Sequence, residues 1–425
     1  MKKLLLLGGI DSFVDLYEDI NKENMEVIVC DQTKEVPCYK IASKFYEVST
    51  TDVNKLNEIV EREEIDILLS AFSDVNLMPS YIVSKKHNLK TIYNENIIEQ
   101  LTNKIVMKKI LKKENYPVIN YCIIDQYYND EELRGLEFPV VTKPIDSYGS
   151  KGVFICQNPE EVRRRFWDCA KFGINEKNKI IVEEYYPYDE ISITAWVKDK
   201  KSYITCIYDL DKNYENNIEL SRVTFPSKYT DKFLNQIKIL VQKLTHTFGI
   251  TEGPITVQCF IGPRGLKVSE FLYRLAGGAP YRYTMMLGGP NIAQMLVDYL
   301  ADQSIDYSNL YKANPRSEYI YYSYRVYVKG GQKLFFDYDK DNLIEKVPYC
   351  CDAAIYYENG EWIPEGEKVH TRIFCRVKKN QNILYDDILN ILEENLVIAN
   401  EFGVNMANFH KPLHKANLQC YSFKL

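Results

Sequence analysis

The sequence predicts a mixed protein of the α/β and α+β classes, and three observations point to this fold class. Buried strands alternate with amphipathic helices over the first hundred residues, which is typical of a parallel sheet with right-handed crossovers. Glycine-bearing turns between alternating apolar segments follow and predict antiparallel hairpins. From about Ser308 the chain carries many tyrosines that alternate with polar residues, which favours a small β-rich domain.

Composition sets the broad class of the protein. The chain has 425 residues, of which 46% are hydrophobic and 26% are charged, so it is large enough for about two or three domains. A net charge of −6, spread without long runs, argues against nucleic acid and anionic membranes as main partners. No apolar run approaches the roughly 20 residues that span a bilayer, and the opening MKKLLLLGGIDSF is expected to be a buried strand, not a signal peptide.

Cysteine and histidine usage predicts neither disulfides nor a zinc site. Eleven cysteines occur singly except for the adjacent Cys350 and Cys351, and none forms a CxxC pair. We expect them to be reduced core residues of a cytoplasmic protein. The five histidines follow no ligand spacing.

The N-terminal elements follow from the hydrophobic pattern. Strands are expected at residues 3–7, 25–30, 65–70 and 90–93, with helices between them. Gly8 and Gly9 follow the first strand, but no GxGxxG motif is present. A nicotinamide cofactor is therefore not expected.

Helices beyond residue 100 have clear boundaries. One is expected from about Thr102 to just before Tyr116, because the residue that precedes Pro117 is pushed out of the helical region. Another begins at residues 158–161, Asn-Pro-Glu-Glu, which supply a cap, a proline in the first turn and acids near the positive end of the dipole. A third has its apolar stripe over residues 233–244.

The segment FPVVTKPIDSYGSKGV at residues 138–153 is the most informative part of the chain. A strand ends in a lysine, and a loop rich in glycine and serine precedes the next strand. Glycines let backbone N–H groups turn toward an anion, serines add hydroxyl donors and lysines add charge. A purely structural hairpin loop remains an alternative. The candidate phosphate-binding residues are Lys143, Ser147, Gly149, Ser150, Lys151 and Gly152.

A second hairpin is predicted within residues 253–278. Its turn, residues 263–265, is Pro-Arg-Gly, in which proline suits a type I turn and glycine takes the left-handed position. We expect the hairpin to close with Gly262 opposite Leu266.

This register brings polar side chains together on one face of the hairpin. Gln258 is expected directly opposite Glu270, and Leu272 and Arg274 continue the same face because strands alternate with period two. A carboxamide and a carboxylate side by side supply the hard oxygen ligands that Mg²⁺ prefers. The alternative is a polar pair on an exposed face of the sheet.

Together these motifs resemble the ATP-grasp superfamily, specifically its carboxylate-amine ligases related to biotin carboxylase and the carbamoyl-phosphate synthetase large subunit. The resemblance covers nearly the whole chain and includes KFYEVSTTDVNKL at residues 44–56 and the Ser73-Asp74 loop. It implies a pre-ATP-grasp α/β domain over residues 1–100, an ATP-grasp lid lobe over 101–186, a metal- and substrate-binding lobe over 187–307, so that two lobes clamp ATP, and a β-rich C-terminal domain over 308–425.

The resemblance also implies a nucleotide site. The loop at residues 146–152 would close over the β and γ phosphates, and IIVEEYYPYDEIS at 180–192 matches the hinge that holds adenine and ribose. The alternative, solvated strand residues at Glu183 and Glu184, stays open. The implied nucleotide-binding residues are Lys104, Lys143, Ser147, Gly149, Ser150, Gly152, Glu183, Glu184, Tyr185 and Glu190.

The metal and substrate signature of the superfamily is an acid or glutamine followed by E-x-N-x-R. Gln258 and Glu270 match it as metal ligands, whereas Leu272 stands where asparagine is usual, so one or two Mg²⁺ sites remain possible. Mn²⁺ is a possible substitute. Arg274 and Lys143 are the implied catalytic residues, with Arg274 holding the substrate carboxylate and later the acyl phosphate.

The implied activity is that of an ATP-dependent ligase. It would activate a carboxylate as an acyl phosphate and join it to an amine, expected to be an amino acid, with release of ADP and phosphate. The alternatives are an ATP-grasp kinase and a nucleotide-binding protein without catalysis. Small-molecule substrates and a possible homodimer are the expected partners. A pocket role for residues 281–283 is a further alternative to simple packing.

Overall fold

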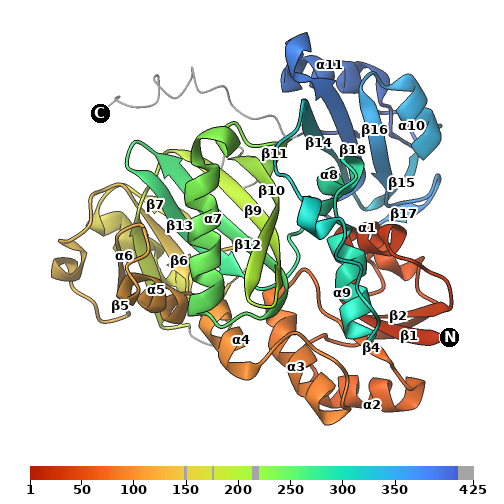
Figure 1. The fold of residues 1–425 in the computed structure, drawn as a ribbon. Coiled ribbons are helices and arrows are strands. Elements are labelled where there is room, and N and C mark those ends of the chain that lie inside the picture. Colours follow the sequence, from red (N-terminus) through yellow and green to blue (C-terminus); the bar gives the residue numbers. More distant parts are fainter. Residues whose placement is uncertain (148–150, 175–176, 213–219, 410–425) are drawn as a thin grey trace.

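The computed structural model describes residues 1–147, 151–174, 177–212 and 220–409 (Figure 1). Its N-terminal unit contains a parallel sheet in the order β3-β2-β1-β4, with helices in the connections. The strand–helix alternation therefore produces the predicted α/β unit. Its elements are β1 (Lys2–Leu7), α1 (Asp11–Asp19), β2 (Met25–Asp31), β3 (Lys44–Glu47), α2 (Val53–Glu63), β4 (Ile67–Leu69) and α3 (Leu77–Lys86).

Residues 90–93 do not form the strand that the sequence predicts. The carbonyl of Ile92 accepts a hydrogen bond from the Tyr273 hydroxyl at 3.0 Å. Ile92 therefore contacts the hairpin strand region of the next lobe instead of extending the N-terminal sheet.

A second, antiparallel sheet has the order β5-β8-β6-β7 and lies within residues 101–186, the predicted lid lobe. Its strands are β5 (Tyr121–Asp125), β6 (Val140–Pro144), β7 (Phe154–Cys156) and β8 (Lys179–Glu184), and its neighbouring helices are α4 (Glu95–Thr102), α5 (Lys104–Lys113) and α6 (Pro159–Ala170). Asn103 caps α5 by accepting hydrogen bonds from two backbone N–H groups. Asn158 caps α6 at the predicted position.

The largest sheet has eight strands in the order β13-β12-β9-β10-β11-β14-β18-β16. Strand β11 pairs with β14 through Val223–Ser323, Thr224–Tyr322 and Phe225–Tyr321. Strands on both sides of residue 307 thus belong to one continuous sheet. Its members are β9 (Asp189–Lys198), β10 (Lys201–Lys212), β11 (Leu220–Phe225), β12 (Glu252–Gly262), β13 (Gly265–Leu272), β14 (Tyr319–Lys329), β16 (Cys350–Ile355) and β18 (Glu367–Lys378).

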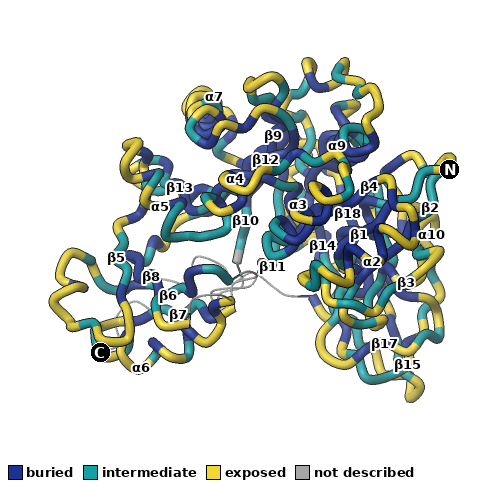
Figure 2. The backbone as a smooth tube through the Cα atoms, turned by 90° about the horizontal axis from the view of Figure 1, so that it is seen from below, coloured by how far each residue is buried: buried dark blue, intermediate teal, exposed yellow. Residues whose placement is uncertain are grey.

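Helices and a small sheet cover this framework. Helix α7 lies across one face of the large sheet, and α9 lies between that sheet and the N-terminal unit (Figure 1). The remaining elements are α7 (Thr230–Thr247), α8 (Tyr281–Met286), α9 (Ile292–Leu300), α10 (Lys340–Lys346), α11 (Tyr385–Asn395) and the small sheet of β15 (Gln332–Phe335), β17 (Trp362–Ile363) and β19 (Ala399–Asn400). The strands of the large sheet are mostly buried (Figure 2). The predicted α/β and α+β fold class is confirmed.

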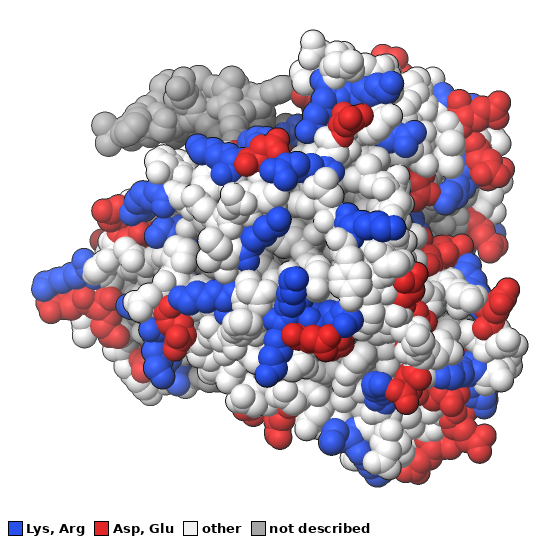
Figure 3. Space-filling model, in the orientation of Figure 1, with Lys and Arg blue, Asp and Glu red and all other residues white. Residues whose placement is uncertain are grey.

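The described part of the chain has mixed surface charge and free cysteine thiols. Basic and acidic side chains are interspersed over the face seen in Figure 3. All ten cysteines among the described residues are free thiols. None of the helices in the described ranges has the length and apolar character required to cross a bilayer.

Candidate functional site

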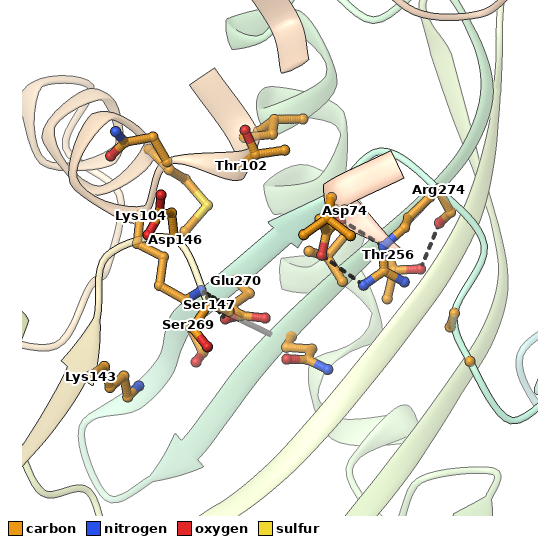
Figure 4. Close-up of a pocket in the computed structure, with 18 of the residues that line it drawn as sticks. Asp74, Thr102, Lys104, Lys143, Asp146, Ser147, Thr256, Ser269, Glu270 and Arg274 are labelled. Atoms are coloured by element: carbon orange, nitrogen blue, oxygen red, sulfur yellow. Dashed lines mark hydrogen bonds and ion pairs between the residues drawn. The ribbon is translucent and has the colours of Figure 1, made fainter. Parts of the chain in front are cut away.

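A cavity of about 1100 Å³ lies where the N-terminal unit, the lid lobe and the large sheet meet. Figure 4 shows two groups of polar side chains within it, one around Lys104, Lys143 and Glu270 and the other around Asp74 and Arg274. The predicted site residues that line this cavity are Lys104, Lys143, Ser147, Glu190, Gln258, Glu270 and Arg274.

Lys143 is held at the end of β6 by a buried carboxylate on the neighbouring strand. Its Nζ lies 2.8 Å from Oε2 of Glu183, and the Nζ of Lys108 on α5 lies 2.7 Å from Oε1 of the same carboxylate. Burial would raise the pKa of Glu183, but the two ammonium groups outweigh it and hold this pKa at about 2. Glu183 is therefore ionised at neutral pH between two lysines.

Lys104 connects the other walls of the cavity. It is the first residue of α5, and its Nζ donates to the carbonyl of Ser147 at 2.6 Å and lies 3.8 Å from Oε1 of Glu270. Helix α5, the loop after β6 and the hairpin thus meet at one ammonium group.

The predicted phosphate loop is only partly described. Gly149 and Ser150 lie outside the described residues, whereas Ser147 and Lys151 line the cavity. Gly152 is buried, has a φ of +74°, and leaves no room for a Cβ, which would lie 2.8 Å from Phe172 and 2.9 Å from Pro144. Packing and backbone conformation explain this glycine, and it is not among the residues that line the cavity.

The β12–β13 hairpin pairs Gln258 with Glu270 as predicted, but by a different route. The ladder closes with Gly262 opposite Gly265, not opposite Leu266, and a register shift between Gln258 and Cys259 compensates for this difference. Gly265 has the expected positive φ of 80°. The bulge therefore restores the pairing that a regular hairpin would have lost.

The hairpin face carries both polar ligands and an apolar side chain into the cavity. Gln258 and Glu270 lie beside Thr256 and Leu272, which form the next cross-strand pair on the same face of the hairpin. In the described residues, no three His, Cys, Asp or Glu side chains cluster as a metal site. One carboxylate and one amide fit a Mg²⁺ ion that takes its other ligands from phosphate and water.

Arg274 is already paired in this structure. Its Nε and Nη2 donate to the two carboxylate oxygens of Asp74 at 2.7 and 3.0 Å, and its Nη1 donates to the Leu275 carbonyl at 2.9 Å. Burial would raise the pKa of Asp74, but the guanidinium outweighs it and lowers this pKa. Asp74 therefore fixes the plane of Arg274 while other N–H groups of the guanidinium remain for a ligand.

The hinge residues differ in their placement. Glu183 and Glu184 are 2% and 7% exposed, so the alternative of solvated strand residues is wrong. Glu184 accepts from the Asn120 amide at 2.9 Å, and the backbone N–H of Tyr185 donates to the Pro139 carbonyl at 2.9 Å. Glu183, Glu184 and Tyr185 do not line the cavity, whereas Glu190 does.

The sequence did not predict the roles of two residues that line the cavity, Asp74 and Arg325. Asp74 was part of a recognised loop but not predicted as the partner of Arg274. Arg325, on β14, reaches the cavity and lies beside Gly278, where a Cβ would come within 2.9 Å of its Nη2. The glycine at position 278 was the only available signal, because Arg325 itself stands in an ordinary tyrosine-rich strand.

The alternative pocket at residues 281–283 is not supported. These side chains are buried outside the cavity, and Arg282 pairs with Asp19 at 2.6 Å and with Asp15 at 3.4 Å. Arg282 thereby joins α8 to the N-terminal unit.

The fold and the cavity define a class of protein in which a small antiparallel lobe and a larger sheet face each other across a lysine-bearing site. The family model of the ATP-grasp domain matches residues 109–276. This part of the chain is therefore an ATP-grasp domain.

The relatives support this assignment at low identity. A formate-dependent phosphoribosylglycinamide formyltransferase of Sulfurisphaera tokodaii is 24% identical over 211 residues, which are 48% of this chain and 52% of the relative. The chain thus spans about half the length of such curated relatives.

Solved structures reproduce the fold over nearly the whole chain. The biotin carboxylase domain of the Hydrogenobacter thermophilus 2-oxoglutarate carboxylase has a TM-score of 0.76 and 14% identity, covering 94% of this chain and 91% of its own. The L-amino acid ligase of Bacillus licheniformis has a TM-score of 0.70 and 14% identity, covering 94% and 98%.

Proposed function

We propose that this protein is an ATP-dependent ligase that activates a substrate carboxylate as an acyl phosphate and joins it to an amine. The observation that carries the proposal is that one cavity contains Lys104, Lys143 and the Gln258–Glu270 pair, and also the Asp74–Arg274 pair. The first group suits nucleotide phosphates and the second suits an organic anion. The cavity volume of about 1100 Å³ is enough for both ligands.

The nucleotide end would bind ATP. Lys104, Lys143 and Ser147 would contact its phosphates, and Glu190 would bind the ribose. Gln258 and Glu270 would hold Mg²⁺, for which Mn²⁺ is a possible substitute. The metal would neutralise charge on the transferring phosphoryl group. Glu183, Glu184 and Tyr185 would support the hinge near adenine.

Two arginines, Arg274 and Arg325, would bind the substrate carboxylate. Asp74 occupies Nε and one N–H of Nη2 on Arg274, so a carboxylate would be held by the remaining N–H groups of Arg274 together with Arg325. Leu272 and Met78 offer apolar contact to the rest of the acid.

The reaction would proceed in two displacements. A carboxylate oxygen attacks the γ phosphorus of ATP, and ADP leaves. The amine nitrogen then attacks the acyl carbon and loses a proton to solvent, and phosphate leaves with the electron pair of the broken C–O bond. Because the acyl phosphate reacts with water, the loop after Lys143 would serve to exclude solvent.

The names of two similar proteins support a carboxylate and an amine as the substrate classes. Formate is a carboxylate and glycinamide carries an amine, and an L-amino acid ligase joins amino acids through the same two groups. An amino acid is therefore the proposed amine. The biotin carboxylase domain named above is described as a dimer, which supports a homodimer here. The free thiols support a cytoplasmic location.

The proposal is tested by incubating the protein with ATP, Mg²⁺ and pooled carboxylic acids and amino acids. We expect ADP and free phosphate only when both an acid and an amine are present. A stable phosphorylated product would indicate a kinase instead. No ADP with any pool would leave a nucleotide-binding protein without catalysis.

A further inference from the structure

Lys108 is a buried cation that the proposed reaction does not use directly. It lies in the middle of α5, one turn after Lys104, and is 2% exposed. Its Nζ lies 2.7 Å from Oε1 of Glu183 and 5.5 Å from the centroid of the Tyr121 ring. Tyr121 stands directly opposite Glu183 in the β5–β8 ladder, so the ring and the carboxylate together enclose the ammonium group.

Glu183 holds two lysines that differ in access to the cavity. Lys108 is enclosed, whereas Lys143 lines the cavity and its side chain is 21% exposed. Burial would lower the pKa of Lys143, but Glu183, Glu270 and Glu190 outweigh it and raise this pKa. Lys143 is therefore a charged group that faces several carboxylates before any phosphate arrives.

The charges of the trio explain why a second lysine is needed. Glu183 carries one negative charge, and Lys108 and Lys143 carry one positive charge each, so the trio has a net charge of +1. Without Lys108, the buried Glu183–Lys143 pair would be neutral, and a phosphate beside Lys143 would meet a weaker net attraction.

We infer that Lys108 is a positioning residue for nucleotide binding: by pairing with Glu183 from the buried side, it leaves the charge of Lys143 available to the phosphates of a nucleotide. The inference rests on the proposed function, because it assumes that a nucleotide binds beside Lys143. Lys108 acts through Glu183 and does not touch the ligand.

The test compares the affinities of ADP and adenosine by calorimetry. In Lys108→Met, ADP binding weakens by about tenfold, because the phosphates lose one net charge at close range. Adenosine binding changes by less than about twofold, because adenosine carries no phosphate that the charge of the trio could attract. Lys112→Met is the matched control, since Lys112 lies one turn further along α5, 5.7 Å from the same Tyr121 ring, and is exposed. Its ADP affinity stays unchanged.

A double variant separates positioning from simple disruption. In Lys108→Met combined with Glu183→Gln, both the cation and the anion are removed, and the net charge of +1 returns through Lys143. We expect ADP affinity to recover to within about threefold of the unaltered protein. Equal weakening of ADP and adenosine, or no recovery in the double variant, would overturn the inference. Failure of the unaltered protein to bind ADP would overturn the proposed function and the inference with it.

Discussion

At the scale of single residues, the cavity has charged groups whose positions are fixed by ion pairs with neighbouring side chains. Lys143, Glu270 and Arg274 line the cavity, and Glu183 and Asp74 fix Lys143 and Arg274 through short ion pairs. This arrangement keeps charged side chains in defined positions before a ligand binds. Substitutions of the fixed groups and of their ion-pair partners should therefore have different effects.

Lys143→Met and Glu270→Ala should each lower kcat for ADP formation by at least about a hundredfold, because each removes a charge next to the transferring phosphoryl group. The measurement is ADP release with saturating ATP and both substrates. Lys112→Met, on the exposed side of α5, serves as the control with normal activity. Full activity in either site variant would contradict the assignment.

Arg325→Leu should raise KM for the carboxylate substrate by about 10- to 100-fold, the range expected for loss of a hydrogen bond to a charged group. KM for ATP should change little, because the proposed ligand of Arg325 is the carboxylate and not the phosphates. Arg376→Leu is a suitable control on the neighbouring β18, where the side chain is exposed. A rise in KM for ATP alone would mean that Arg325 contributes to nucleotide binding and not to binding of the carboxylate substrate.

At the scale of elements, α5 has its capping residue directly beside a site residue. Asn103 accepts hydrogen bonds from the backbone N–H groups of Ile105 and Val106 at 3.0 and 3.2 Å, and Lys104 follows it at once. The cap therefore orients the first turn of the helix and, with it, the ammonium group that reaches Ser147.

Asn103→Ala should cost about 1 kcal/mol of unfolding free energy and should also raise KM for ATP. Asn158→Ala removes the corresponding cap of α6, which accepts from Glu161 N at 2.9 Å and lies away from the cavity. We expect the same loss of stability there without a change in KM. Thermal unfolding and initial rates measure the two effects, and equal KM values in both variants would refute the coupling of cap and site.

The sequence predicts local elements better than their distant contacts. The α5 and α6 boundaries follow from caps and prolines within a few residues, and the Gln258–Glu270 pair follows from one hairpin. The bulge that rescues this pair leaves no local pattern. Lys108 looks like one more cation in a lysine-rich helix, because its burial depends on β5 and β8.

At the scale of the whole molecule, a buried ionic network joins α1 of the N-terminal unit to α8 and β18. Arg372 on β18 pairs with Asp15 and, at 2.6 Å, with Asp11, both on α1. Arg282 approaches Asp15 from α8 at 3.4 Å. Asp15 is fully buried, so its charge depends on these partners.

Arg372→Met should lower the unfolding free energy by about 3–5 kcal/mol, because it leaves Asp15 buried with one fewer cation. Lys22→Met breaks the exposed Lys22–Glu18 pair at 3.1 Å and should change stability by less than about 1 kcal/mol. Urea unfolding compares the two variants. A similar small effect for both variants would mean that the network contributes little to the free energy of unfolding.

The continuous eight-stranded sheet has a consequence for shortening the chain. Strand β14 covers β11 through paired backbone groups, and it also carries Arg325 into the cavity. A fragment of residues 1–307 should therefore expose β11 as a bare edge strand and aggregate, which gel filtration would detect. The part of the protein that follows the ATP-grasp match is thus not a detachable appendage: the strand that covers the edge of β11 also supplies a side chain to the cavity.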